Sequence, residues 1–170
     1  VGNESPLNAY GYSKLVFDQH VRAREIRRAK KHSTVIGLRY FNVYGLNEGH
    51  KWSMASVIYH LNKQLSSSDT VTLFTGSHGY ASGEQRRDFV HVNDVVNLTI
   101  WAGGQPPSSS GIYNCGTGIS ETFNAVGNAV VEFHGRGRIE YVQFPSELLP
   151  AYQANTKANM NRLREIGYVD

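Results

Sequence analysis

The chain has 170 residues, of which 40% are hydrophobic and 18% are charged, and its formal net charge is +3. This composition fits one globular domain with a hydrophobic core and excludes disordered, collagenous and fibrous proteins. A single cysteine, Cys115, excludes an internal disulfide, and no apolar run approaches the roughly 20 residues of a membrane span, so we expect a soluble, cytoplasmic protein.

Hydrophobic periodicity and turn residues predict alternating helices and strands along the whole chain. The expected helices are 6–31, 53–65, 93–104 with Asn93 or Asp94 as its cap, 121–133 and 156–167, and the expected strands are 34–45, 70–76, 86–92, 111–118 and 138–145. The linker-like run 104–111 is interpreted as a surface loop. This alternation predicts an α/β protein with a partly parallel sheet.

Basic residues gather in the segment "VRAREIRRAKKH", residues 21–32. No aromatic residues are interleaved with them, as they would be on a nucleic-acid-binding surface. We interpret the segment as a solvated helix face and expect neither a nucleic-acid nor a membrane partner.

The stretch "NAYGYSK" places Tyr10 four residues before Lys14 on the first expected helix. Residues four apart are neighbours on one helix face, and a nearby positive charge favours the phenolate form of a tyrosine. The spacing is typical of a proton-transferring tyrosine with a lysine partner. It is equally met by two ordinary residues on one helix face, and the pair alone does not separate the two interpretations.

A dinucleotide-binding enzyme also needs a glycine-rich turn between a strand and a helix to receive the pyrophosphate. The nearest candidate, "GTGISE" at 116–121, comes after the Tyr10 helix and receives little weight as a phosphate loop. We therefore expect residues 1–170 to be the C-terminal portion of a longer protein.

Several motifs occur in an order that resembles extended short-chain dehydrogenase/reductase enzymes acting on sugar nucleotides. They are "NAYGYSK", "LRYFNVYG", "EGHKWSMASVIYHLNKQL", "RRDFVHVNDVVNLTIW" and "IYNCGTG". Most also resemble UDP-glucose 4-epimerases and nucleotide-sugar dehydratases. The segments "EGHKWSMAS", "HLNKQL", "LFTGS" and "AYQANTKANMNRLREIGY" are narrower and resemble the ADP-L-glycero-D-manno-heptose 6-epimerase family.

The resemblance implies the end of a Rossmann-type domain interleaved with a substrate-binding domain, the N-terminal glycine-rich cofactor half being absent. It implies NADP as cofactor and ADP-heptose as substrate, with transient oxidation and re-reduction inverting carbon 6 for lipopolysaccharide inner-core synthesis. A homo-oligomer, commonly a pentamer, is also implied. No metal site is predicted. The isolated 170 residues are expected to be inactive, because half of the pocket would be missing.

Two acid/base groups follow from the resemblance. Tyr10 matches the catalytic tyrosine, and Lys14 matches the lysine that holds the nicotinamide ribose. Lys51 matches a second catalytic base that also borders the cofactor. A lysine acts as a base where burial or a positive neighbour lowers its pKa, and His50 and Lys14 are the candidate neighbours. Taken alone, Lys51 is an ordinary exposed loop lysine.

Further positions match the family's pocket. Val43 is expected against the nicotinamide, and the matches to substrate-contacting positions are Asn42, Ser53, His60, Phe74, Thr75, Gly76, Ser77, Arg87 and Tyr152. Ser53 and His60, seven residues apart, are expected on one helix face. Arg87 fits a diphosphate because its guanidinium binds phosphate oxygens in pairs, although an ion pair with Asp88 or Glu84 would also explain it.

The chain departs from the family pattern at three positions. Leu46 replaces a proline, Trp52 replaces the glycine after the second base, and Thr75 replaces an acidic residue. Two other functions stay open: another sugar-nucleotide epimerase or dehydratase such as a UDP-glucose 4-epimerase, and a non-catalytic nucleotide-sugar-binding module.

Overall fold

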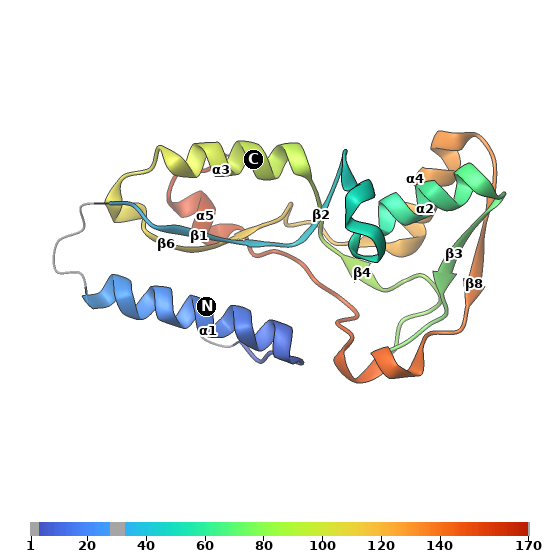
Figure 1. Ribbon diagram of the computed structural model, residues 1–170, viewed down its shortest axis with the longest axis horizontal. Coiled ribbons are helices and arrows are strands. Elements are labelled where there is room, and N and C mark those ends of the chain that lie inside the picture. The colour runs from blue at the N-terminus through green and yellow to red at the C-terminus, as the bar shows by residue number, and fades with distance from the viewer. Residues whose placement is uncertain (1–3, 28–32, 170) are drawn as a thin grey trace.

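The computed structural model describes residues 4–27 and 33–169 and confirms the predicted α/β class. Helices and strands alternate along the chain (Figure 1). The α-helices are α1 (Ala9–Arg27), α2 (Val57–Ser67), α3 (Val92–Gly103), α4 (Phe123–His134) and α5 (Asn161–Glu165), and the short 3-10 helices are η1 (Glu48–Met54), η2 (Pro107–Ser109) and η3 (Ser146–Ala151). The strands are β1 (Ile36–Tyr40), β2 (Asn42–Tyr44), β3 (Thr70–Phe74), β4 (Arg86–Arg87), β5 (Phe89–His91), β6 (Gly111–Cys115), β7 (Glu121–Thr122) and β8 (Arg138–Val142).

The strands pair mainly in parallel. β1 pairs with β6, β2 with β5 and β3 with β8, whereas β4 and β7 are antiparallel. Figure 1 shows the β1–β6 pair with α1, α3 and α5 at one end of the molecule, and the β3–β8 pair with α2 and α4 at the other. Short β2 and β4 lie between the two ends.

Each end of the molecule has its own hydrophobic core. One core consists of Leu98, Tyr113, Cys115, Ala158, Met160 and Leu163, and the other of Leu61, Leu65, Val71, Leu73 and Val130. The second core shows the expected helical spacing, because Leu61 and Leu65 of α2 are four residues apart and share one face. Burial of these side chains holds α2 and α4 against β3 and β8.

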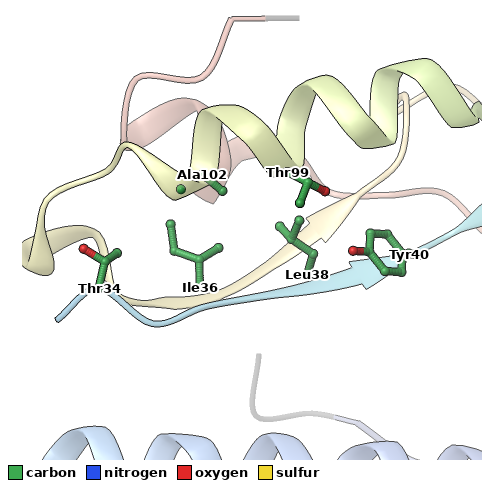
Figure 2. Close-up of a pocket in the computed structure, with 7 residues that line it drawn as sticks. Thr34, Ile36, Leu38, Tyr40, Thr99 and Ala102 are labelled. Carbon is green, nitrogen blue, oxygen red and sulfur yellow. The ribbon is translucent and has the colours of Figure 1, made fainter.

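Helices α3 and α1 lie on opposite sides of the β1–β6 pair (Figure 1). Alternate side chains of β1, those of Ile36, Leu38 and Tyr40, point toward α3, where Thr99 and Ala102 complete a cavity of about 330 Å³ (Figure 2). Strand periodicity explains this shared direction.

Ion pairs tie α1 to β1. Arg39 of β1 pairs with Asp18 of α1 and also lies 2.8 Å from the Glu4 carboxylate, which accepts a second contact from Arg22 at 3.0 Å. No residue of α1 enters either hydrophobic core among the described residues, and Phe17 is 65% exposed. Charge, rather than apolar burial, thus dominates the attachment of α1.

Two expected strands are divided in the structure. The strand expected at 34–45 becomes β1 and β2, with a break at Phe41, because Phe41 donates its N–H to Cys115 on β6 while Asn42 donates to the carbonyl of Asp88. The strand expected at 86–92 is likewise broken at Asp88. Both segments change their pairing partner at the break, which local sequence periodicity does not reveal.

Helix ends also differ from expectation. The helix expected at 53–65 begins only at Val57, because the Ser56 hydroxyl caps it by accepting the N–H of Tyr59 at 3.1 Å. The cap of α3 is the His91 side chain, which accepts the N–H of Asn93, so the expected Asn93 or Asp94 cap is wrong.

The remaining elements follow the predictions with shorter bounds. α1 covers 9–27 of the expected 6–31, and most of the basic segment 21–32 lies outside the residues whose side chains are described. α4 starts after the Thr122 cap, and α5 occupies only part of 156–167. The loop 104–111 contains η2. In the described parts of the chain, no helix has the length and apolar character needed to cross a bilayer.

Asp88, between β4 and β5, is fully buried, and its carboxylate joins three segments. It accepts the N–H and hydroxyl of Thr117, each at 2.8 Å, and the N–H groups of Gly118 and Ala158, each at 2.9 Å. A buried carboxylate is tolerated when such donors replace its water. These bonds fasten the turn after β6 and the segment before α5 to the middle of the fold.

Replacing Asp88 by Asn should destabilise the fold strongly, because an amide nitrogen would face N–H groups that need an acceptor. We expect the free energy of unfolding to fall by about 3 kcal/mol, measured by urea denaturation. The exposed Glu140, replaced by Gln, is the control and should change stability by less than about 0.5 kcal/mol. A loss below about 1 kcal/mol in the Asp88 variant would show that these bonds are not a main support of the fold.

Candidate active site

Tyr10 and Lys14 lie one turn apart on the exposed face of α1. The Lys14 ammonium is 5.0 Å from the centre of the Tyr10 ring, a cation–π distance, and Tyr10 is 72% exposed. Both side chains line a cavity of about 730 Å³ between α1 and β1, with Gln153 on its border. Within the described chain, no carboxylate forms an ion pair with Lys14. The phenol and the ammonium are thus available together at one open cavity.

Lys51 lies on η1 with its side chain 42% exposed, and its ammonium is 3.6 Å from the carboxylate of Glu48. The sequence predicts a positive neighbour, His50 or Lys14, whereas the structure adds a negative one. Lys51 borders neither the Tyr10 cavity nor the cavity around His60. The described residues therefore do not bring the two expected acid/base groups into one cavity.

Glu48 is only 4% exposed, and its carboxylate organises η1. One carboxylate oxygen accepts the N–H of Gly45 at 3.1 Å and the hydroxyl of Ser56 at 2.7 Å, and the other accepts the N–H of Ser56 at 2.7 Å. Burial alone would raise the pKa of Glu48, but the Ser56 and Gly45 hydrogen bonds and the Lys51 charge outweigh it, so the pKa is lowered. Glu48 is therefore held ionised beside Lys51.

Ser53 and His60 do not share a helix face, so that expectation is wrong. Ser53 lies on η1, His60 lies on α2, and the extended residues Ala55 and Ser56, with ψ of 161° and 156°, interrupt the helical backbone between them. Ser53 is exposed and lies two residues after Lys51, whereas His60 lines a cavity with Phe74 and Tyr152.

His60, Phe74 and Tyr152 meet at a smaller cavity of about 230 Å³. Three segments, α2, β3 and the chain after η3, thus bring together side chains expected to contact substrate. Gln85 also lines this cavity and is 2% exposed. Tyr152 lines this cavity, and the next residue, Gln153, lines the Tyr10 cavity. Two consecutive residues therefore contribute to the two cavities.

Arg87 does not itself line the smaller cavity, but it packs against two aromatic rings that do. Its guanidinium carbon lies 4.8 Å from the ring centre of Tyr152 and 5.7 Å from that of Phe123. Burial lowers the pKa of Arg87 from its ordinary value, partly opposed by Tyr152, and burial likewise raises the pKa of Tyr152, opposed by Arg87. A partly desolvated guanidinium suits an anionic ligand.

The carboxylates proposed as structural partners of Arg87 are engaged elsewhere. Asp88 accepts backbone and hydroxyl groups of the turn after β6, and Glu84 accepts the side-chain amide of Asn124 at 2.6 Å. Arg87 itself donates to the carbonyl of Arg86 at 2.9 Å. In the described ranges no carboxylate forms an ion pair with Arg87, which favours the ligand-binding interpretation.

The segment 74–77 uses its polar groups within the fold. The Thr75 hydroxyl accepts the N–H of Phe144, and the Ser77 hydroxyl accepts the side-chain amide of Gln85, each at 3.1 Å. A Cβ on Gly76 would lie 2.3 Å from the Tyr80 carbonyl oxygen, so only glycine fits there. A nucleotide contact by Thr75, Gly76 or Ser77 stays a prediction.

Asn42 and Val43 open β2, directly after β1 ends. Asn42 is exposed and Val43 is half-buried, paired with Phe89 and Val90 of β5. Their position follows the carboxyl end of a parallel strand, where ligands bind in α/β proteins. Glycine-rich 116–118, by contrast, donates its N–H groups to Asp88, so a protein carboxylate takes the place of a phosphate there.

Sequence reasoning did not identify Glu48 and Gln85 as buried polar residues, and it considered Asp88 only as an ion-pair partner of Arg87. Glu48 has a local signal, since it stands three residues before Lys51 on a short helix. Asp88 depends on partners 29 to 70 residues away, whereas the Gln85 side chain bonds to Thr75 and Ser77, ten and eight residues before it. The described residues contain no group of three or more His, Cys, Asp or Glu side chains suited to a metal ion.

The parallel α/β fold and the Tyr10–Lys14 pair on α1 agree with a family match: residues 1–116 match the NAD dependent epimerase/dehydratase family. The chain belongs to this family.

Relatives and solved structures agree with this assignment. Over 165 residues the chain is 53% identical to the ADP-L-glycero-D-manno-heptose-6-epimerase of Alkalilimnicola ehrlichii, covering 97% of this chain and 50% of the relative. The crystal structure of the Helicobacter pylori ADP-L-glycero-D-manno-heptose-6-epimerase matches with a TM-score of 0.80 and 31% identity, over 98% of this chain and 48% of that one.

The Thermus thermophilus UDP-glucose 4-epimerase complex with NAD matches with a TM-score of 0.74 and 26% identity, over 97% of this chain and 50% of that one. The chain therefore spans about half the length of the relatives that it matches.

Trp52 adopts a backbone conformation that favours glycine, with φ of 51° and ψ of −126°, and its side chain is 82% exposed. Replacing Trp52 by Gly should relieve this strain and raise the free energy of unfolding by about 1 kcal/mol, measured by urea denaturation. Met54, also exposed but with helical backbone angles, is the control, and its replacement by Gly should lower stability. Equal losses in both variants would show that Trp52 is not strained.

Proposed function

We propose that these 170 residues supply the C-terminal half of an NADP-dependent epimerase that inverts carbon 6 of ADP-glycero-manno-heptose. The proposal rests on the Tyr10–Lys14 pair at an open cavity, together with the relatives named for this activity. The product would serve lipopolysaccharide inner-core heptose synthesis in the cytoplasm.

The cavity between α1 and β1 fits a nicotinamide cofactor. It is open, and the ammonium of Lys14 has no carboxylate partner in the described chain, so it can bind ribose hydroxyls. Val43 would contact the nicotinamide. When bound, the cofactor supplies hydride transfer at carbon 6. The resemblance favours NADP, whereas the family description and the Thermus thermophilus complex name NAD. Bound-nucleotide analysis of the purified full-length protein distinguishes NADP from NAD.

Tyr10 and Lys51 would exchange protons with the sugar on opposite sides. Tyr10 would remove the proton of the carbon 6 hydroxyl when the epimer bound on its side is oxidised, with the Lys14 ammonium 5.0 Å from the centre of its ring. Lys51 exchanges a proton from the other side, which requires the sugar to bridge from the α1 cavity to η1. Asn42 and Ser53 are proposed sugar contacts along this path.

The smaller cavity would bind the nucleotide part of the substrate. Arg87 offers a partly desolvated guanidinium to the diphosphate, and Tyr152 beside it offers an aromatic face. His60 lines the same cavity, and the backbone of 74–77 borders it at Phe74. Tyr152 and Gln153, consecutive in the chain, link the nucleotide and sugar regions.

Residues 1–170 would be the end of a Rossmann domain interleaved with a substrate-binding domain. The glycine-rich cofactor half would come from the remaining length of the relatives. The isolated 170 residues should then be inactive, because the cofactor would not be held in geometry. We further propose a homo-oligomer, commonly a pentamer by the resemblance, which light scattering of the full-length protein tests.

In the full-length protein, replacing Tyr10 by Phe or Lys51 by Met should each remove one proton transfer and lower kcat with ADP-heptose by about 10²- to 10⁴-fold. Epimerisation is measured by chromatographic separation of the two heptose epimers. UDP-glucose serves as the competing substrate. Preferred turnover of UDP-glucose would favour a 4-epimerase, and full activity of either variant would exclude the assignment of two acid/base residues.

Arg87 should contribute mainly to substrate binding. Its replacement by Ala in the full-length protein removes a bidentate contact and should raise KM for ADP-heptose about 10- to 100-fold, with a smaller fall in kcat. Lys at this position should restore binding only in part, because an ammonium lacks the planar fork. A thermal melt run in parallel separates the alternatives: lower stability with unchanged KM would make Arg87 structural.

A further inference from the structure

Glu48 occupies a position that no motif assigns to it. It is buried at 4% exposure, yet its carboxylate lies 3.6 Å from the ammonium of the exposed Lys51. A buried carboxylate next to an exposed lysine is costly unless other donors satisfy it. Three donors do so, two from Ser56 and one from Gly45. These three hydrogen bonds therefore fix the carboxylate independently of Lys51.

The partners of Glu48 lead to different parts of the candidate site. Gly45 follows β2, the strand of Asn42 and Val43, and a Cβ there would lie 2.4 Å from the Val92 side chain, so this turn is packed closely. Ser56 caps α2, the helix that carries His60. One carboxylate therefore sets the separation between the end of β2 and the start of α2, with Lys51 between them.

The contact to Lys51 differs in kind from the other three. Its 3.6 Å separation is longer than a hydrogen bond, which runs to about 3.2 Å. The attraction restrains the flexible lysine without occupying its donors. Lys51 is the third residue after Glu48 on η1, so the short helix also fixes the direction from which the ammonium approaches.

We propose that Glu48 is the positioning residue for Lys51: its buried carboxylate restrains the ammonium on η1, between the end of β2 and the start of α2, while leaving the N–H donors free for a bound sugar nucleotide. This inference rests on the proposed function of Lys51. Glu48 itself touches no reacting atom. Its effect on turnover should therefore pass through Lys51 and disappear when the ammonium is absent.

The test is a double-mutant cycle in the full-length protein. Glu48→Gln removes the charge but keeps the size of the side chain, and Lys51→Met removes the ammonium. We expect Glu48→Gln to lower kcat about 10²-fold with little change in KM, since a misplaced catalytic group costs roughly this much. In the Lys51→Met background, Glu48→Gln should change kcat by less than about twofold. Glu140→Gln is the matched control, because it removes an exposed paired carboxylate on β8 and should leave kcat unchanged.

Each outcome separates the alternatives. An equal loss of kcat from Glu48→Gln in both backgrounds would make Glu48 merely structural and overturn the proposal. Full activity of Lys51→Met, in contrast, would overturn the proposed role of Lys51 itself. Thermal melts identify a variant that does not fold. In that case Glu48→Asp, which keeps the charge but moves it, completes the same cycle, and its loss of kcat should again depend on Lys51.

Discussion

The buried carboxylate of Asp88 is the contact on which the arrangement of this fold depends. Asp88 lies between β4 and β5, and its carbonyl accepts the N–H of Asn42 at the break between β1 and β2. Its four hydrogen bonds join residues 29 to 70 positions away, from the turn after β6 to the chain before α5. The two hydrophobic ends of the molecule are each held by local burial, whereas this charge fixes the chain between them.

Two buried carboxylates, Asp88 and Glu48, each lie near a basic residue in the chain. In the described residues Glu48 forms an ion pair with its basic neighbour and Asp88 does not. Backbone N–H groups and the Thr117 hydroxyl satisfy Asp88, and the adjacent Arg87 forms no ion pair with it but packs against the rings of Tyr152 and Phe123. Glu48 is also satisfied by neighbouring donors, yet it keeps the ammonium of Lys51 within 3.6 Å.

Sequence patterns predicted much of this structure, because helix and strand periodicity are local. Alternating elements gave the parallel α/β class, and the four-residue spacing placed Lys14 against Tyr10. What they missed depends on distant partners. The break at Phe41 arises from hydrogen bonds to β6 and Asp88, and the start of α2 from the Ser56 cap, which separates Ser53 from the helix of His60. The pairing of Arg87 with aromatic rings was equally invisible, since Asp88 next to it was the simpler partner.

Different interactions hold the candidate acid/base groups in place: hydrogen bonds of a buried carboxylate for Lys51, and surface ion pairs for the helix of Tyr10 and Lys14. Lys51 lies on η1, which a buried carboxylate and the Ser56 cap hold in place, while Tyr10 and Lys14 lie on a helix that contributes no residue to either described core. That helix is tied to β1 mainly through Arg39, whose charge is shared by Asp18 and Glu4. Burial would lower the pKa of Arg39, but these two carboxylates more than compensate and raise it, so the guanidinium remains a fixed charge. Ion pairs hold direction well but weaken with salt, whereas packed cores do not. The position of Tyr10 and Lys14 relative to β1 therefore depends on the ion pairs of Arg39 more than on either hydrophobic core.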